Sequence, residues 1–201
     1  MTAAGTAPGA SAMAGLRAAA WPYHQRLERR LDVKARFSTL EGYRQHLEQM
    51  LGFCAPLEQR LGAASFSREL PDLDARRKVP LLTEDLLVLG ASAHSLADIP
   101  RCTCLPSYAD AAGVFGSLYV LEGATLGGRT LLPLVRRQLG LSAVRGARFL
   151  ASYGDQVAPM WSRFGMALEA WCVEQERRAA VAAAAVATFA ALENWLCGAR
   201  P

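Results

Sequence analysis

The chain has 201 residues, of which 52% are hydrophobic and 20% are charged, with a formal net charge of +4. This composition predicts one globular domain with a sizeable core and excludes a disordered chain. Basic residues alternate with acidic ones along the sequence, whereas a nucleic-acid-binding surface needs a dense basic stripe, so nucleic acid is excluded as a partner.

The N-terminal residues, the hydropathy and the cysteines indicate the cellular compartment of the protein. Residues 1–12 are rich in Ala, Gly, Thr and Pro, lack the regions of a signal peptide, and are predicted to form a flexible tail before a single domain at 13–198. The alanine run from Ala179 to Ala187 is interrupted and weakly apolar, so no membrane-spanning segment is expected. The five cysteines form no Cys-x-x-Cys pair and are interpreted as reduced thiols. We expect a cytoplasmic protein.

Apolar residues recur every three or four positions along most of the chain, which predicts an all-α fold. In chain order, helices are expected at residues 16–31, 40–61, 83–89, 107–128, 130–139, 147–153, 157–173 and 174–197. Pro22 implies a kink or a later start of the first helix. Ser38 or Thr39 is expected to cap the second helix, which Gly62 ends, and Thr83 to cap the third. Residues 91–106 are predicted to form a loop.

One predicted helix carries glycines where a helix normally avoids them. Residues 118–128 read LYVLEGATLGG, and each glycine costs about 1 kcal/mol relative to alanine in a helix interior. Gly123 and Gly127 are four residues apart and share one face. Because they lack side chains, that face admits a flat, bulky guest up to the backbone. A break in the helix is expected after Gly128.

The sequence contains three histidines, at positions 24, 46 and 94. His46 and His94 are interpreted as solvent-exposed. His24 is followed at i+4 by Glu28, whose carboxylate can accept the Nδ1 proton and leave Nε2 free to bind a metal. The alternative is a partly buried histidine that pairs with a neighbour on its helix, and the spacing alone favours that alternative.

The remaining residues narrow the choice of metal. No second histidine or cysteine has a zinc-like spacing to His24, and the Glu-x-x-His motif of a di-iron bundle is lacking. One axial histidine and a bare glycine face suit a heme held between two helices, with the histidine on the proximal side of the iron.

Two segments resemble the heme-contacting helices of the bacterial heme oxygenases. Residues 16–28, LRAAAWPYHQRLE, resemble the proximal helix, and residues 118–128 resemble the distal helix. The likeness continues in the same order through residues 53–58, 85–90 and 188–196. The resemblance implies a single-domain helical bundle in which heme is sandwiched between a proximal and a kinked distal helix.

The resemblance also implies roles for individual residues. His24 would be the axial ligand of the heme iron, with Glu28 as its hydrogen-bonding partner and Arg17 near a heme propionate. The catalytic candidates are His24, Gly123 and Gly127, and the further candidates for heme binding are Tyr119, Gly128 and Arg129. The helical spacing of Tyr119 favours a core position, and Arg129 fits a solvated surface equally well. Ala124 stands where animal members carry an aspartate that orders distal water, so backbone carbonyls are the expected substitute.

The implied activity is that of a heme oxygenase, which degrades heme b with O₂ and reductant to biliverdin, CO and ferrous iron. Heme would then be both cofactor and substrate. The implied partners are an electron donor, either ferredoxin or a flavin reductase, and a bacteriophytochrome that accepts biliverdin; iron release from scavenged heme is the other use. Two other classes stay open: a heme carrier of the same fold without turnover, and a helical bundle without heme in which His24 is structural.

Overall fold

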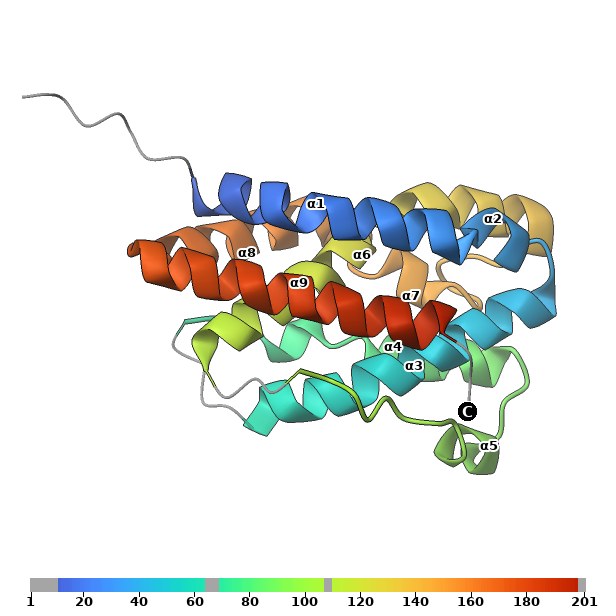
Figure 1. The fold of residues 1–201 in the computed structure, drawn as a ribbon. Coiled ribbons are helices and arrows are strands. Elements are labelled where there is room, and N and C mark those ends of the chain that lie inside the picture. The colour runs from blue at the N-terminus through green and yellow to red at the C-terminus, as the bar shows by residue number, and fades with distance from the viewer. Residues whose placement is uncertain (1–10, 64–68, 107–109, 199–201) are drawn as a thin grey trace, which may run out of the picture.

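The computed structural model describes residues 11–63, 69–106 and 110–198, and within these ranges the chain forms a bundle of helices without a β-strand (Figure 1). The prediction of an all-α fold is confirmed. In chain order the elements are α1 (Ala12–Leu31), α2 (Val33–Arg36), α3 (Leu40–Ala63), η1 (Asp74–Arg76), α4 (Val79–Val88), α5 (Ala93–Ala97), α6 (Ala111–Leu139), α7 (Arg148–Ala151), η2 (Gly154–Gln156), α8 (Val157–Trp171) and α9 (Gln175–Cys197).

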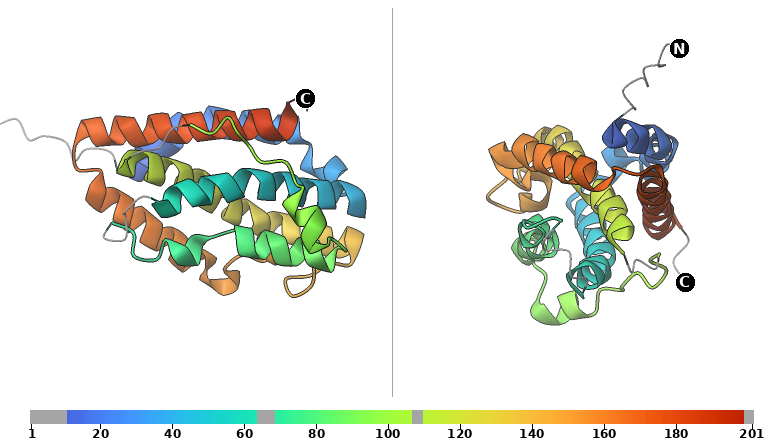
Figure 2. Two further views of the ribbon diagram at one scale, coloured as in Figure 1. Left: turned by 90° about the horizontal axis from the view of Figure 1, so that it is seen from below. Right: turned by 90° about the vertical axis from the view of Figure 1, so that its left-hand side faces the viewer.

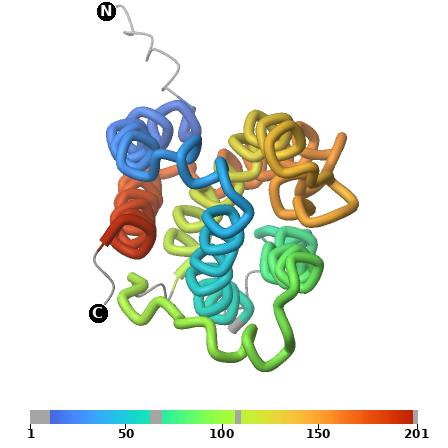
Figure 3. The backbone as a smooth tube through the Cα atoms, turned by 90° about the vertical axis from the view of Figure 1, so that its right-hand side faces the viewer, coloured from blue at the N-terminus to red at the C-terminus, as the bar shows by residue number. Residues whose placement is uncertain are grey.

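Helix α9 lies against both α1 and α6, which pack mainly through α9 rather than on each other (Figures 2 and 3). Its inward-facing residues are buried, namely Val181, Ala185, Thr188, Phe189, Leu192, Glu193 and Leu196. By length and composition α9 is apolar enough to cross a membrane, a test that the core helix of a bundle also passes. In this structure its buried face packs against α1 and α6. The bundle therefore places α1 and α6 as two walls that rest on one shared helix.

The first helix begins earlier than Pro22 suggested. Helix α1 starts at Ala12 and continues through Pro22, so the predicted later start is wrong. Ser11 caps it by accepting from the Ala14 N–H (3.1 Å), and Glu169 of α8 accepts from the N–H groups of Ala12 and Met13. Residues 1–10 of the predicted tail lie outside the described residues, and the tail's last residue, Ala12, is already helical and buried.

The ends of α3 and α4 show where local signals fail. Thr39 caps α3 as expected, because its Oγ1 accepts from the Gly42 N–H (3.1 Å). Gly62 does not end α3, which extends to Ala63. Thr83 is not a cap, because α4 begins at Val79, whose N–H donates to the Glu58 carboxylate of α3 (3.2 Å). A cap supplied by a distant helix leaves no local signature.

The predicted loop at 91–106 contains one short helix, α5, which Ser92 caps by accepting from the Ser95 N–H (3.1 Å). The rest of this segment lacks regular structure, as expected. The predicted start of the glycine helix at 107 lies outside the described residues.

Helix α6 is continuous, so the predicted break after Gly128 is wrong. It nevertheless changes direction along its length, as Figure 1 shows. Two causes lie in its sequence. The hydroxyls of Ser117, Thr125 and Thr130 donate to carbonyls one turn earlier, which bends helices, and Pro133 lacks the N–H that would complete the ladder.

Candidate functional site

His24 is held by aromatic rings rather than by hydrogen bonds. Its imidazole stacks on Trp21 (centroids 5.5 Å apart, planes at 11°) and meets Phe189 of α9 edge-on (5.9 Å, 86°). The Nδ1 atom is buried and forms no hydrogen bond with the described residues. Glu28 Oε2 lies 3.6 Å from Nδ1, just beyond hydrogen-bonding distance. Among the residues that the structure describes, Nδ1 therefore has no hydrogen-bonding partner.

The other two histidines differ from each other. The side chain of His94 is 90% exposed beside Asp98, as predicted. The prediction that His46 is exposed is wrong: it is buried, with its ring against Phe37 (5.1 Å). Burial, together with the positive charge of Arg36, lowers the pKa of His46 to about 3. A neutral, buried ring of this kind is part of the core.

Gly123 and Gly127 present open backbone. A Cβ built on either glycine would meet nothing within 4 Å outside its own helix, so packing within the chain does not require glycine there. Leu126, on the same side of α6, is 37% exposed although it is a large apolar residue. The glycine pair therefore leaves space for something that is not part of the chain.

Gly128 has a different environment from the heme contact that the sequence suggested. It is buried against α7, and a Cβ on Gly128 would lie 2.5 Å from the carbonyl oxygen of Leu150. Such a distance is far below van der Waals contact. Gly128 thus allows α6 and α7 to pack closely, and it does not share the open face of Gly123 and Gly127.

Arg17 and Tyr119 connect the two walls at one end. Tyr119 of α6 is half-buried and its ring lies 5.7 Å from that of Trp161. Burial raises the pKa of the Tyr119 hydroxyl, and the nearby Arg17 guanidinium of α1 opposes that rise. Arg17 is exposed and has no ion pair within the described ranges. Arg129 is also exposed, but two residues beyond Gly127 it lies on another side of α6.

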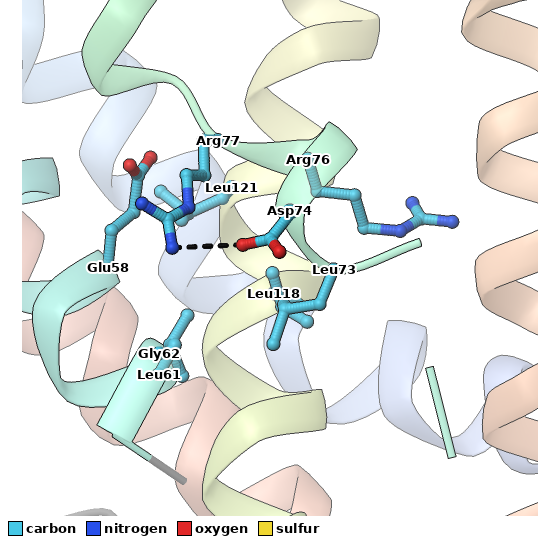
Figure 4. Close-up of a pocket in the computed structure, with 9 residues that line it drawn as sticks. All are labelled: Glu58, Leu61, Gly62, Leu73, Asp74, Arg76, Arg77, Leu118 and Leu121. Carbon is cyan, nitrogen blue, oxygen red and sulfur yellow. Dashed lines mark ion pairs between the residues drawn. The ribbon is translucent and has the colours of Figure 1, made fainter. Parts of the chain in front are cut away.

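A small cavity lies elsewhere, between α3, η1 and α6 (Figure 4). Its volume of about 20 Å³ holds no more than one water molecule. Its charged lining residues are Glu58, Asp74, Arg76 and Arg77, while Leu118 and Leu121 are apolar lining residues from α6. None of the candidate site residues lines this cavity.

The residues between α1 and α6 fit a heme group. The imidazole of His24, 39% exposed, can supply an iron ligand from α1, and the backbone of Gly123 and Gly127 is open on α6. Trp21, which is 47% exposed, offers apolar surface for a porphyrin ring to cover. Arg17 offers an unpaired cation for a propionate.

Sequence reasoning missed the aromatic rings that hold His24. Trp21 lies at i−3, and that spacing was an available signal. Phe189 was interpreted as a core residue, and it is buried, but its contact with His24 joins residues far apart in the sequence. No local pattern predicts such a contact.

The described residues define an α-helical bundle in which α1 and α6 both pack on α9. Residues 10–197 match the sequence profile described as heme oxygenase. Over 128 residues the chain is 38% identical to a protein named heme oxygenase from Xanthomonas campestris pv. campestris (strain 8004), covering 63% of this chain and 72% of that protein. The crystal structure of the NO- and CO-bound heme oxygenase from Neisseria meningitidis has the same fold, with a TM-score of 0.80 and 22% identity, over 94% of this chain and 91% of that one.

The chain belongs to the heme oxygenase family. Members of this family are oxidoreductases that take heme as both substrate and cofactor, use O₂ and need a supply of electrons.

Proposed function

We propose that this protein degrades heme b to biliverdin, CO and ferrous iron, with O₂ and electrons from a reductase. The observation that carries the proposal is the unpaired imidazole of His24 on one wall and the open backbone of Gly123 and Gly127 on the other, both resting on α9. Heme, when bound, supplies the iron that binds O₂ and the ring that is oxidised.

On the proximal side, the imidazole of His24 would hold the heme iron through Nε2. Glu28 then accepts the Nδ1 proton, for which the two groups need to approach by only about 0.5 Å from their present 3.6 Å separation. This bond fixes the tautomer and the orientation of the imidazole. Trp21 and Phe189 restrict the ring from both sides and keep it from rotating away.

On the distal side, Gly123 and Gly127 form the wall that faces the ring. No side chain at these positions competes with O₂ for space. Ala124 carries no polar group, so the hydrogen bonds that order distal water come from the α6 backbone rather than from a carboxylate. The shape of this wall directs O₂ toward one edge of the macrocycle.

The propionates determine which carbon of the ring reaches that wall. Arg17 is the primary anchor, since its guanidinium is exposed, unpaired within the described ranges and near Tyr119. Tyr119 contributes its hydroxyl at the same end. Arg129 is a secondary candidate, because reaching a propionate from its side of α6 requires an extended side chain.

The proposal includes the partners that this reaction needs. Ferredoxin or a flavin reductase supplies the electrons, and a bacteriophytochrome accepts biliverdin as its chromophore, in the cytoplasm. Co-expression with an apo-bacteriophytochrome tests the second partner: covalent chromophore attachment that depends on this chain supports it, and apo-phytochrome in the presence of measured biliverdin formation contradicts it.

Turnover is tested by loading the purified chain with heme under anaerobic conditions and then adding O₂ and a reductase system. Biliverdin absorption and release of CO are the expected results. A second candidate function is a heme carrier, which Ala124 favours because no acidic side chain serves the distal water. Stable binding of heme that survives O₂ and reductant unchanged identifies the carrier and contradicts the oxygenase.

A further inference from the structure

We propose that Glu122 is a positioning residue, which fixes the glycine face of α6 through a buried cluster of charged groups behind it. The consequence for heme rests on the proposed function. The effect on α6 does not, and it is measurable without heme.

The Glu122 carboxylate is fully engaged within the protein. Its Oε2 accepts from Arg76 Nη1 (2.9 Å), and its Oε1 accepts from Lys78 Nζ (3.1 Å) and from the Tyr153 hydroxyl (2.6 Å). The side chains of Glu122, Arg76 and Lys78 are 1%, 0% and 2% exposed. The prediction from sequence that Glu122 pairs with an arginine is confirmed, but its partners come from two segments far from it in the sequence, one with Arg76 and Lys78 and one with Tyr153.

The cluster extends beyond these contacts. Arg76 also donates to both carboxylate oxygens of Asp72 (2.9 and 2.8 Å) and to the carbonyl of Met160 in α8 (3.2 Å). Lys78 donates to the Tyr153 hydroxyl (2.6 Å). Figure 4 shows Arg76 among the residues that line the small cavity, together with Leu118 and Leu121 of α6. The cluster therefore ties α6 to η1, to the segment before α4, to the turn after α7 and to α8.

The charges in the cluster depend on Glu122. Burial lowers the pKa of Lys78, and the charge of Glu122 opposes that change. Burial, together with the Glu122 charge, raises the pKa of Tyr153 above its usual range, so its hydroxyl stays protonated and donates. Without the carboxylate, two buried cations lose a shared partner.

Such a cluster specifies geometry more than it adds stability. Buried ion pairs often contribute little net stability, because desolvation offsets their attraction, but loss of one member leaves the others uncompensated. Glu122 immediately precedes Gly123, and a Cβ on Gly123 or Gly127 would meet nothing within 4 Å. The contacts of Glu122 fix the position of the backbone at Gly123 and Gly127. Packing on the glycine face itself cannot do so, because these residues have no side chains.

The first test uses the heme-free protein. Glu122→Gln keeps the shape of the side chain and removes its charge, and we expect amide hydrogen exchange at residues 123–127 to become at least ~10-fold faster. The matched control is Glu193→Gln, since Glu193 is also a buried carboxylate between two cations, Arg26 and Arg30, but joins α9 to α1. The control is expected to leave exchange at residues 123–127 unchanged.

The second test uses the CO complex of the heme-loaded protein. In Glu122→Gln we expect a shifted or broadened C–O stretching band and a mixture of biliverdin isomers, whereas a loss of stability alone would leave both unchanged. If Glu122→Gln does not fold, Tyr153→Phe removes a single hydrogen bond and is expected to produce the same changes at smaller amplitude. Unchanged exchange and an unchanged band in the folded variants would overturn the proposal. Failure of the wild-type chain to form biliverdin contradicts the proposed function only, because the exchange measurement stands without it.

Discussion

Gly127 and Gly128 are neighbours in α6, yet a Cβ on Gly127 would meet nothing within 4 Å, whereas a Cβ on Gly128 would lie 2.5 Å from the carbonyl oxygen of Leu150. One glycine keeps a surface open and the next lets two helices touch. Gly127 therefore leaves space for binding, whereas Gly128 is required for helix packing.

This difference predicts opposite effects on stability. Gly128→Ala forces α6 and α7 apart and should destabilise the heme-free protein by about 1–3 kcal/mol. Gly127→Ala meets open space and should be neutral or stabilising by up to ~1 kcal/mol, because alanine favours the helix. Urea denaturation of the two variants measures the difference, and equal destabilisation by both would contradict the assignment.

Gly123→Val places a branched side chain on the open wall. We expect the variant to fold and to retain heme through His24, but to form biliverdin at least ~10-fold more slowly, a loss typical of a misplaced reacting group. Gly15→Val is the matched control, because Gly15 in α1 is equally open but lies on the opposite side of that helix from His24. Normal turnover in Gly123→Val would refute the distal role of this glycine.

His24→Ala removes the proposed axial ligand. The heme complex of this variant should lose the histidine signature in its electron paramagnetic resonance and resonance Raman spectra, and added imidazole should restore it by occupying the vacated space. His46→Gln, which changes a histidine in the core, should leave the same spectra unchanged. An unaltered ligand field in His24→Ala would show that another group binds the iron.

His46 predicts a specific loss of stability in mild acid. In the unfolded chain it takes up a proton near its ordinary pKa of 6.5, whereas in the folded protein it stays neutral down to about 3. Between these values the unfolded state binds more protons, so the free energy of unfolding falls as the pH falls, by about 2 kcal/mol from about pH 7 to about pH 5.

His46→Gln should lack this contribution. Urea denaturation across that range should therefore show a steeper pH dependence for the wild-type chain than for the variant. Parallel pH dependences would indicate that His46 is protonated in the folded state.

Most of the fold was predictable because the apolar periodicity of a helix lies within its own sequence. The apolar stripes of α1, α3, α8 and α9 placed these helices within a few residues. The predictions were wrong where a contact with a residue far away in the sequence determines the start of a helix or the burial of a side chain. Helix α4 starts at Val79 because Glu58 of α3 caps it, and His46 is buried because Phe37 and its neighbours cover it. Neither partner is marked by the residues around the position itself.

In the candidate site, too, some features follow from local spacing and others depend on contacts between distant segments. His24 and Glu28 are one helical turn apart, so their spacing alone predicts that they lie on one face. The four-residue spacing of Gly123 and Gly127 likewise predicts a shared face, but it does not tell which glycines have neighbours, and Gly128 is buried against Leu150 of α7. The partners of Glu122 could not be predicted, since Arg76, Lys78 and Tyr153 come from segments that only the folded chain brings together.

The alanine content of α9 has a structural consequence. A Cβ on Gly116 of α6 would lie 2.5 Å from the Cβ of Ala184 and 2.7 Å from the backbone nitrogen of Ala185, so these two helices touch almost backbone to backbone. Because Ala184 and Ala185 have small side chains, α9 lies close to the backbone of α6. Because α1 and α6 both pack on α9, a larger side chain at Ala184 should push α6 away from α9 and so change the separation of the two helices that carry His24 and the glycines.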